Sequence, residues 1–182
     1  MPALEAYKRN LDYSYAPGMF PSMEAMKKAP HLVRRLLLSS KAAEGEGVEK
    51  LTALAKQNNI RIEMADKALS RISGKENCFA AAVFEKQPAA LQGGDHVVLH
   101  HISDAGNLGT ILRTALGLGF RDIAIIRPAT DVYDPKVVRS SMGALFSLRV
   151  REYDDFEAYR AEFPSHQLYP FMLDGSVLLE EA

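Results

Sequence analysis

Asn107, Gly109 and Arg113 form the spacing N-x-G-x-x-x-R inside the segment HISDAGNLGTILRTALGLGF, residues 101–120. We predict Asn107 as a helix N-cap, because its side chain can accept a hydrogen bond from a backbone N–H of the first turn. Gly109 allows another backbone or a ligand to approach that turn closely. Arg113 follows one turn later on the same face. A guanidinium near a helix N-terminus can bind phosphate or a developing oxyanion. The simpler interpretation is a capped helix with one solvated arginine.

A second segment, DPKVVRSSMGALFSL at residues 134–148, combines small polar groups with a flexible backbone. Arg139, Ser141 and Gly143 are its candidate functional residues. Such a loop can line a nucleotide pocket. It can equally be a helix that ends at Gly143 in the left-handed conformation, which is the commoner arrangement.

Alternating strands and helices must position these segments. In the second half of the chain, apolar patterns predict strands at 97–102, 123–126, 146–150 and 168–173 and helices at 107–118, 135–145 and 154–163. In the first half they predict strands at 32–38, 60–64 and 78–84 and helices at 48–57 and 65–72. Strands separated by helices of this length indicate parallel crossovers and an open α/β sheet.

The composition and the charge distribution favour two units. The chain has 182 residues, of which 47% are hydrophobic and 25% charged, as in an ordinary globular protein. Residues 87–95, QPAALQGGD, contain a proline and a Gly-Gly pair and are predicted as a linker between residues 1–86 and 96–182. Residues 1–86 carry a net charge of +4 and residues 87–182 a net charge of −5. The first unit is therefore the better candidate for binding a polyanion.

Several protein classes are disfavoured. The single cysteine, Cys78, cannot form an internal disulfide, which fits a reducing compartment. No apolar run approaches the ~20 residues of a membrane helix, and the N-terminus lacks the apolar core of a secretory signal. We therefore expect a cytoplasmic protein with no membrane partner. The histidines at 96, 100 and 101 lack further ligands at suitable spacing, so no metal site is expected.

Together the two segments resemble motifs one and two of the SpoU/TrmH family of RNA 2′-O-ribose methyltransferases, which belong to the knotted SPOUT class. The first motif is matched by Asn107, Gly109 and Arg113, and the second by Arg139, Ser141, Gly143 and Ala144. The upstream unit resembles the family's small substrate-binding domain of the L30e type. The resemblance thus implies an L30e-like domain followed by an open, mostly parallel α/β domain.

The resemblance also implies chemistry. Arg113 would help to activate a ribose 2′-hydroxyl, and Asn107 would orient that arginine. Gly109, Arg139, Ser141 and Gly143 would form the active-site loop. S-adenosylmethionine would donate the methyl group without a metal, the substrate would be ribosomal or transfer RNA, and the full-length protein would be a homodimer.

One part of the family pattern is missing. The third motif, which forms most of the donor pocket and threads the knot, does not follow the predicted strand at 168–173. Leu173, Asp174 and Gly175 would be the residues that contact the donor. We therefore expect a truncated chain without the knot.

The densest basic group is the candidate RNA surface, although solvated charge is the simpler interpretation. Its members are Lys27, Lys28, Arg34, Arg35, Arg71 and Lys75. An RNA-binding module without catalysis remains the alternative function. A nucleotide-binding oxidoreductase is disfavoured, because no third glycine follows Gly117 and Gly119 at the spacing of a dinucleotide fingerprint.

Overall fold

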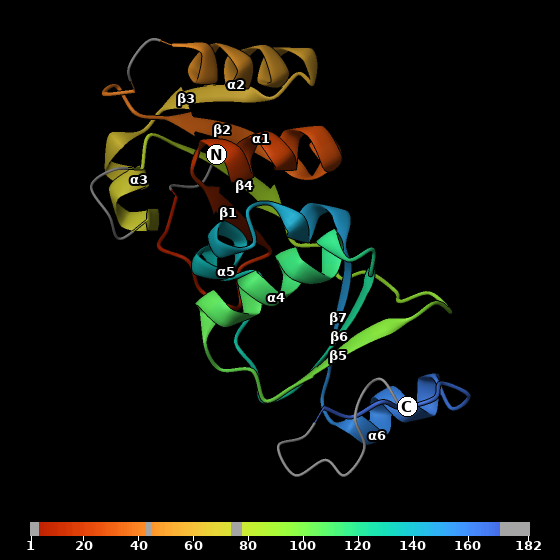
Figure 1. Cartoon of the computed structure of the whole chain (residues 1–182). Helices are drawn as coiled ribbons and strands as arrows, with labels where there is room; N and C mark the ends of the chain where they lie inside the picture. Colours follow the sequence, from red (N-terminus) through yellow and green to blue (C-terminus); the bar gives the residue numbers. More distant parts are fainter. Residues whose placement is uncertain (1–3, 43–44, 74–77, 172–182) are drawn as a thin grey trace.

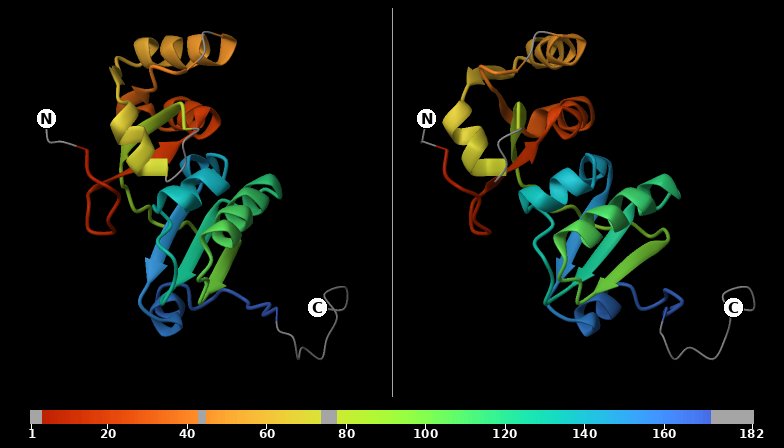
Figure 2. Two further views of the ribbon diagram at one scale, coloured as in Figure 1. Left: turned by 90° about the vertical axis from the view of Figure 1, so that its left-hand side faces the viewer. Right: turned by 60° about the vertical axis from the view of Figure 1, so that its left-hand side comes forward.

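The chain folds into two β-sheets, each flanked by helices. The computed structural model describes residues 4–42, 45–73 and 78–171, with the Ser73 side chain excluded. The first sheet has the order β1 (Tyr13–Pro17), β4 (Ala80–Glu85), β2 (Val33–Leu38) and β3 (Arg61–Met64). The second has the order β5 (His96–His100), β6 (Asp122–Ile126) and β7 (Arg149–Tyr153). Figure 1 and Figure 2 show the first sheet above the second.

Six helices in the described part of the chain cover these sheets. They are α1 (Met19–Lys28), α2 (Glu46–Gln57), α3 (Asp66–Ser73), α4 (Ala105–Gly117), α5 (Pro135–Ser140) and α6 (Phe156–Glu162). The second sheet is entirely parallel, whereas in the first sheet only β2 and β3 are parallel. The predicted α/β class with a parallel sheet is therefore confirmed. No helix among the described residues is long and apolar enough to cross a membrane.

Side-chain alternation along the strands determines which helices cover which face. On β2, Leu36 and Leu38 pack in the same apolar cluster as Met26 of α1 and Leu51 of α2. Leu37, between them in sequence, belongs to the cluster on the opposite face, together with residues of α3. The second sheet follows the same rule: Ile123 and Ile125 pack with α4, and Ala124 and Ile126 pack with α6. This is the two-residue period of a strand that is buried on both faces.

The two sheets share one core. The cluster that contains Leu36 and Met26 continues without a break to Leu112 of α4, Val137 of α5 and Val150 of β7. The predicted linker, residues 87–95, carries the chain from β4 to β5 and contains no helix or strand. The division into domains at 1–86 and 96–182 stays a prediction, because a shared core fits either one domain or two packed units.

The structure differs from the predicted elements in three places. The strand β1 and helix α1 were not predicted. The helix predicted over 135–145 ends at Ser140, because Met142 has a left-handed φ of 52° and a 3-10 turn occupies Ala144–Ser147. Phe146 lies in that turn with its ring 4.9 Å from the ring centre of Phe84, so the strand predicted at 146–150 begins only at Arg149.

The end of the described chain also differs from the prediction. A strand was predicted at 168–173, but residues 168–171 have no regular structure, and Leu173 lies outside the described residues. The absence of a knot stays a prediction.

Candidate active site

The first turn of α4 is capped by Asp104, and not by Asn107 as predicted. Asp104 Oδ1 accepts a hydrogen bond from the Asn107 backbone N–H at 2.7 Å, and Asn107 is the third residue of the helix. The prediction failed because Asp104 stands three residues before Asn107, which is the spacing at which a cap reaches a first-turn N–H. The Asn107 side chain therefore does not cap the helix, and it lies exposed.

The glycine of the first segment packs directly against the second segment. A Cβ atom on Gly109 would lie 1.9 Å from Ser140 Oγ and 2.8 Å from the backbone nitrogen of Ser141. Ser140 Oγ donates to the carbonyl oxygens of Lys136 and Ala105, so it joins the last turn of α5 to the start of α4. The two segments identified from the sequence thus meet at one helix–helix junction, which we call the α4–α5 junction (Gly109, Ser140 and Ser141).

The residues that follow α5 are held by packing. Ser141 is completely buried, and its hydroxyl donates to the carbonyl oxygen of Val138. Gly143 has a φ of +82°, and a Cβ atom there would lie 2.5 Å from Glu24 Cβ on α1. Position 143 requires glycine for two reasons: the backbone is left-handed there, and α1 of the first unit approaches closely. Whether Ser141 and Gly143 act in an active-site loop stays a prediction.

Two exposed arginines flank the α4–α5 junction. Arg113 lies on α4 one turn after Gly109, and Arg139 lies on the last turn of α5. Neither side chain has a hydrogen-bond or ion-pair partner among the residues that the structure describes. A guanidinium has five N–H donors in a planar fork that matches phosphate and carboxylate groups. This junction therefore offers two unneutralised cations to a negatively charged ligand.

The predicted donor contacts Leu173, Asp174 and Gly175 lie outside the described residues. The loops that follow β5 and β6 contact each other, since the Thr130 N–H donates to the Ile102 carbonyl oxygen at 2.8 Å. Within the described part of the chain, no group of three or more His, Cys, Asp or Glu side chains is arranged to hold a metal ion.

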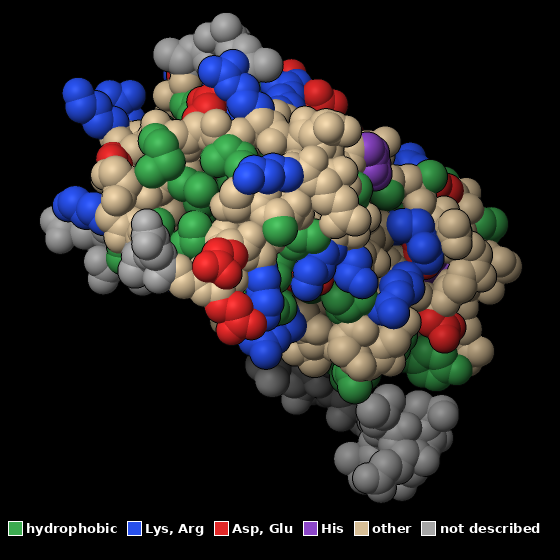
Figure 3. All heavy atoms as spheres, turned by 90° about the horizontal axis from the view of Figure 1, so that it is seen from above, with side chains coloured by type: hydrophobic (Ala, Val, Ile, Leu, Met, Phe, Trp, Pro, Cys, Tyr) green, Lys and Arg blue, Asp and Glu red, His purple; other side chains and the backbone are tan. Residues whose placement is uncertain are grey.

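Several members of the predicted RNA surface are bound to acidic side chains. Arg34 donates to Asp12 and Glu85, and Arg35 is largely buried beside Glu63. Lys28 and Arg71 are exposed, Lys27 lies 3.8 Å from a Glu24 oxygen, and Lys75 lies outside the described residues. Figure 3 shows Lys and Arg side chains on this side of the molecule mixed with acidic and apolar ones. Their role in RNA binding stays a prediction.

The sequence analysis assigned Ser141, and not its neighbour Ser140, to the active-site loop. The two serines are adjacent in sequence, but α5 turns one toward Gly109 and the other into the core. The helical phase at the very end of a short helix decides between them, and boundaries are the least reliable part of a pattern-based prediction.

Residues 95–179 match the SpoU rRNA Methylase family. Both motif segments lie inside the matched region. This part of the chain is therefore similar to SpoU methylases. The predicted family is therefore confirmed for the region that contains α4 and α5, while the match leaves the first 94 residues uncovered.

Curated relatives align with short parts of the chain. A 23S rRNA (uridine(2479)-2′-O)-methyltransferase from Streptomyces viridochromogenes is 48% identical over 52 residues, which are 29% of this chain and 18% of the relative. The human mitochondrial rRNA methyltransferase 3 is 39% identical over 54 residues, 30% of this chain and 13% of the relative.

Solved structures resemble nearly the whole fold. The SpoU methyltransferase AviRb from Streptomyces viridochromogenes, in complex with AdoMet, matches with a TM-score of 0.70 at 24% identity, over 87% of this chain and 62% of that one. A TrmH-family RNA methyltransferase, described as putative, from Porphyromonas gingivalis matches with a TM-score of 0.64 at 25% identity, over 84% of this chain and 59% of that one. The SpoU fold therefore includes the first sheet, and the chain spans about 60% of these solved chains.

Proposed function

We propose that this chain takes part in S-adenosylmethionine-dependent methylation of a ribose 2′-hydroxyl in ribosomal or transfer RNA, as one subunit of a cytoplasmic homodimer. The observation that carries the proposal is the α4–α5 junction, where Arg113 and Arg139 lie exposed without an acidic partner among the described residues. The relatives' names support RNA as the substrate, and the AdoMet in the AviRb structure supports the donor.

The chemistry explains why unneutralised arginines suit this reaction. A ribose hydroxyl is a weak acid, and transfer of a methyl group to its oxygen requires alignment of the two atoms and loss of the hydroxyl proton. A guanidinium stabilises negative charge on the oxygen and on the neighbouring phosphate. An acidic partner would cancel this effect. We assign this role to Arg113, and the orientation of its side chain to Asn107.

The methyl donor supplies an electrophilic carbon on a sulfonium group. The residues predicted to contact it lie outside the described chain, so the described residues support only the hydroxyl side of the reaction. There, Gly109 allows α5 to pack against the first turn of α4 and so fixes the distance between the helices that carry the two arginines.

The test is methyl transfer from radiolabelled S-adenosylmethionine to structured ribosomal and transfer RNA, with digestion to locate the label on ribose. We expect transfer by the full-length protein that contains this chain and at least a hundredfold loss in its Arg113→Gln variant, in the range of lost transition-state donors. Arg61→Gln is the matched control, because Arg61 is an exposed arginine on β3, far from α4 in the fold. RNA binding without transfer would instead support the non-catalytic RNA-binding module, and label on a base would contradict the ribose assignment.

A further inference from the structure

A second group of cationic side chains lines a cavity beside the linker. This cavity of about 530 Å³ opens between the N-terminal segment, the linker, the loop after β6 and the edge strand β7. Its charged lining consists of Arg9, Lys86, Arg127, Asp131, Arg151 and Glu152. We call this cavity the linker groove. Four of its six charged side chains are cationic, and they come from both halves of the chain.

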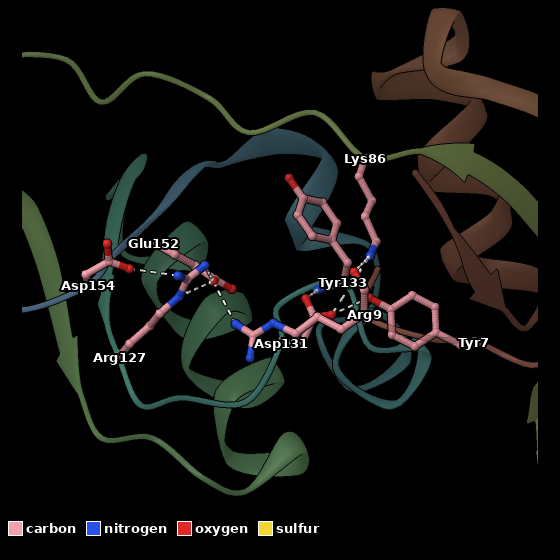
Figure 4. A network of polar contacts seen from close by, with 8 residues as sticks. All are labelled: Tyr7, Arg9, Lys86, Arg127, Asp131, Tyr133, Glu152 and Asp154. Atoms are coloured by element: carbon pink, nitrogen blue, oxygen red, sulfur yellow. Dashed lines mark hydrogen bonds and ion pairs between the residues drawn. The ribbon is translucent and has the colours of Figure 1, made fainter. Parts of the chain in front are cut away.

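One carboxylate oxygen holds two of the arginines. Glu152 Oε2 accepts hydrogen bonds from Arg9 Nη2 at 2.8 Å and from Arg127 Nε and Nη2 at 3.0 and 2.8 Å (Figure 4). Arg127 Nη1 also donates to Asp154, but Asp154 is 84% exposed and solvent screens its charge. One carboxylate that is 17% exposed thus faces two guanidinium groups that are each about half exposed.

The other acidic side chain of the groove, Asp131, already has partners of its own. Asp131 accepts a hydrogen bond from the Tyr7 hydroxyl and lies 4.0 Å from Lys86 Nζ. Lys86 is 11% exposed, its Nζ donates to the Arg9 carbonyl oxygen, and the same Nζ lies over the ring of Tyr7. Burial lowers the pKa of Lys86, and burial together with the bond to Asp131 raises the pKa of Tyr7. These contacts hold Asp131 and Lys86, which line the groove, in place.

Two arginines of the groove, Arg9 and Arg151, have N–H donors that bond no described residue. Arg9 bonds through Nη2 alone, and its Nε and Nη1 have no partner among the described residues. Arg151 bonds to Glu162 through Nη1 alone, with its guanidinium 5.0 Å from the ring centre of Tyr153. Partly exposed arginines with free donors and an excess of positive charge are the arrangement that binds phosphate groups.

We propose that the linker groove binds the phosphate backbone of a single RNA strand, with Arg9 and Arg127 as its main contacts. This inference rests on the proposed function, which makes RNA the substrate. An RNA strand fits better than a small free anion, because the cations are distributed along a groove that joins both halves of the chain. The groove would hold substrate beside the linker, away from the reacting hydroxyl.

The test is binding of a labelled single-stranded RNA of about ten nucleotides, measured by fluorescence anisotropy at about 50 and 200 mM salt. We expect Arg9→Gln and Arg127→Gln each to weaken binding about fivefold or more and to reduce the salt dependence by about one counterion. Arg61→Gln serves as the control, since Arg61 is also exposed and paired with a glutamate but lies on β3.

Glu152→Gln separates phosphate binding from a purely structural role. The amide keeps an acceptor oxygen for the two arginines and removes the charge that competes with phosphate. We expect RNA affinity to rise in Glu152→Gln, whereas a clamp that only holds the two halves together would make all three variants bind more weakly. Unchanged binding in Arg9→Gln and Arg127→Gln, weaker binding in Glu152→Gln, or binding of inorganic phosphate without RNA would each overturn the inference.

Methyl transfer gives an independent readout for the proposed function. A chain that binds RNA through the groove but transfers no methyl group would contradict the proposed function and support this inference. If the protein methylates RNA while its groove variants bind RNA like the wild type, the proposed function is supported and the proposal of RNA binding in the linker groove is overturned.

Discussion

The arginines of this protein fall into two groups that differ in their partners. Arg113 and Arg139, beside the α4–α5 junction, have no acidic partner among the described residues. Arg34 in the first sheet bonds two carboxylates, and Arg149 in the second bonds the buried Asp122 through Nε and Nη2. An arginine with a carboxylate partner of its own joins neighbouring elements and gives up its charge. An unpaired arginine keeps its charge for a ligand, and Arg9 and Arg127, which share the single carboxylate of Glu152, keep part of theirs. The partners therefore distinguish structural from functional arginines better than local charge density does.

The largest effect on stability is expected from Gly109→Ala, which disrupts the packing of the two helices that carry Arg113 and Arg139. The new methyl group would overlap Ser140 Oγ and approach the Ser141 backbone nitrogen at 2.8 Å, so α4 and α5 must separate. We expect the free energy of unfolding to fall by about 3 kcal/mol, at the upper end of overpacking effects, and methyl transfer to be lost. Urea denaturation and the transfer assay measure the two effects.

Gly117→Ala is the matched control, because Gly117 lies in the same helix and a Cβ atom there meets nothing within 4 Å. We expect it to stabilise the fold by up to about 1 kcal/mol through helix propensity. Equal stability of the two alanine variants would show that the α4–α5 contact carries no packing constraint.

The sequence predicts the central strand of the second sheet well, because strands that are buried on both faces read as continuous apolar runs. Ile123–Ile126 is one of these runs, and β6 spans Asp122–Ile126. It predicts β1 and α1 poorly. The helix α1 begins after Gly18 with Phe20 half exposed and Pro21 buried, so its apolar pattern follows the shape of its neighbours and not one regular stripe.

For the candidate site, residue types and spacing identify both motif segments but not their contacts. Asn107 was predicted as the cap, yet Asp104 takes that position, because both are good capping residues and only the path of the chain after β5 decides between them. The predicted basic group includes Arg34 and Arg35, whose partners Asp12, Glu85 and Glu63 are distant in sequence. Pairings across a sheet cannot be predicted from local charge alone.

A smaller loss of stability is expected from Asp122→Asn, which removes the carboxylate partner of Arg149. Burial raises the pKa of Asp122, but the hydrogen bonds from Arg149 and the Gln92 N–H outweigh it and leave that pKa below its usual value. A lowered pKa means that the ionised pair stabilises the fold above about pH 4 and that this stabilisation is lost at lower pH. At pH 7 we expect Asp122→Asn to cost about 2 kcal/mol.

Denaturation between about pH 2 and pH 7 tests this assignment. The wild-type chain should lose stability more steeply on acidification than Asp122→Asn, because the variant lacks this titrating group. Asp154→Asn is the control, since Asp154 also pairs with an arginine but is 84% exposed, and its effect should stay below about 0.5 kcal/mol. Parallel pH profiles for wild type and Asp122→Asn would contradict the role of the buried pair.

Asp104→Ala removes the cap of the helix that carries Arg113. Loss of the bond to the Asn107 N–H should cost about 1 kcal/mol and loosen the first turn of α4. Asp104→Asn keeps an acceptor oxygen and should retain most of that stability. If Asp104→Ala is as stable as the wild type, the first turn of α4 depends on its packing against α5 and not on its cap.

The smallest effect on stability, and the sharpest contrast in function, is expected from Arg113→Gln compared with Arg34→Gln. Arg113 has no partner to lose, so its replacement should change the free energy of unfolding by less than about 0.5 kcal/mol while abolishing methyl transfer. Arg34 bonds two exposed carboxylates, and its loss should cost up to about 1 kcal/mol with transfer retained. Because the two changes are chemically identical, only their partners can produce opposite outcomes. If Arg113→Gln destabilises the fold more than Arg34→Gln, the unpaired arginine is structural and the distinction by partners fails.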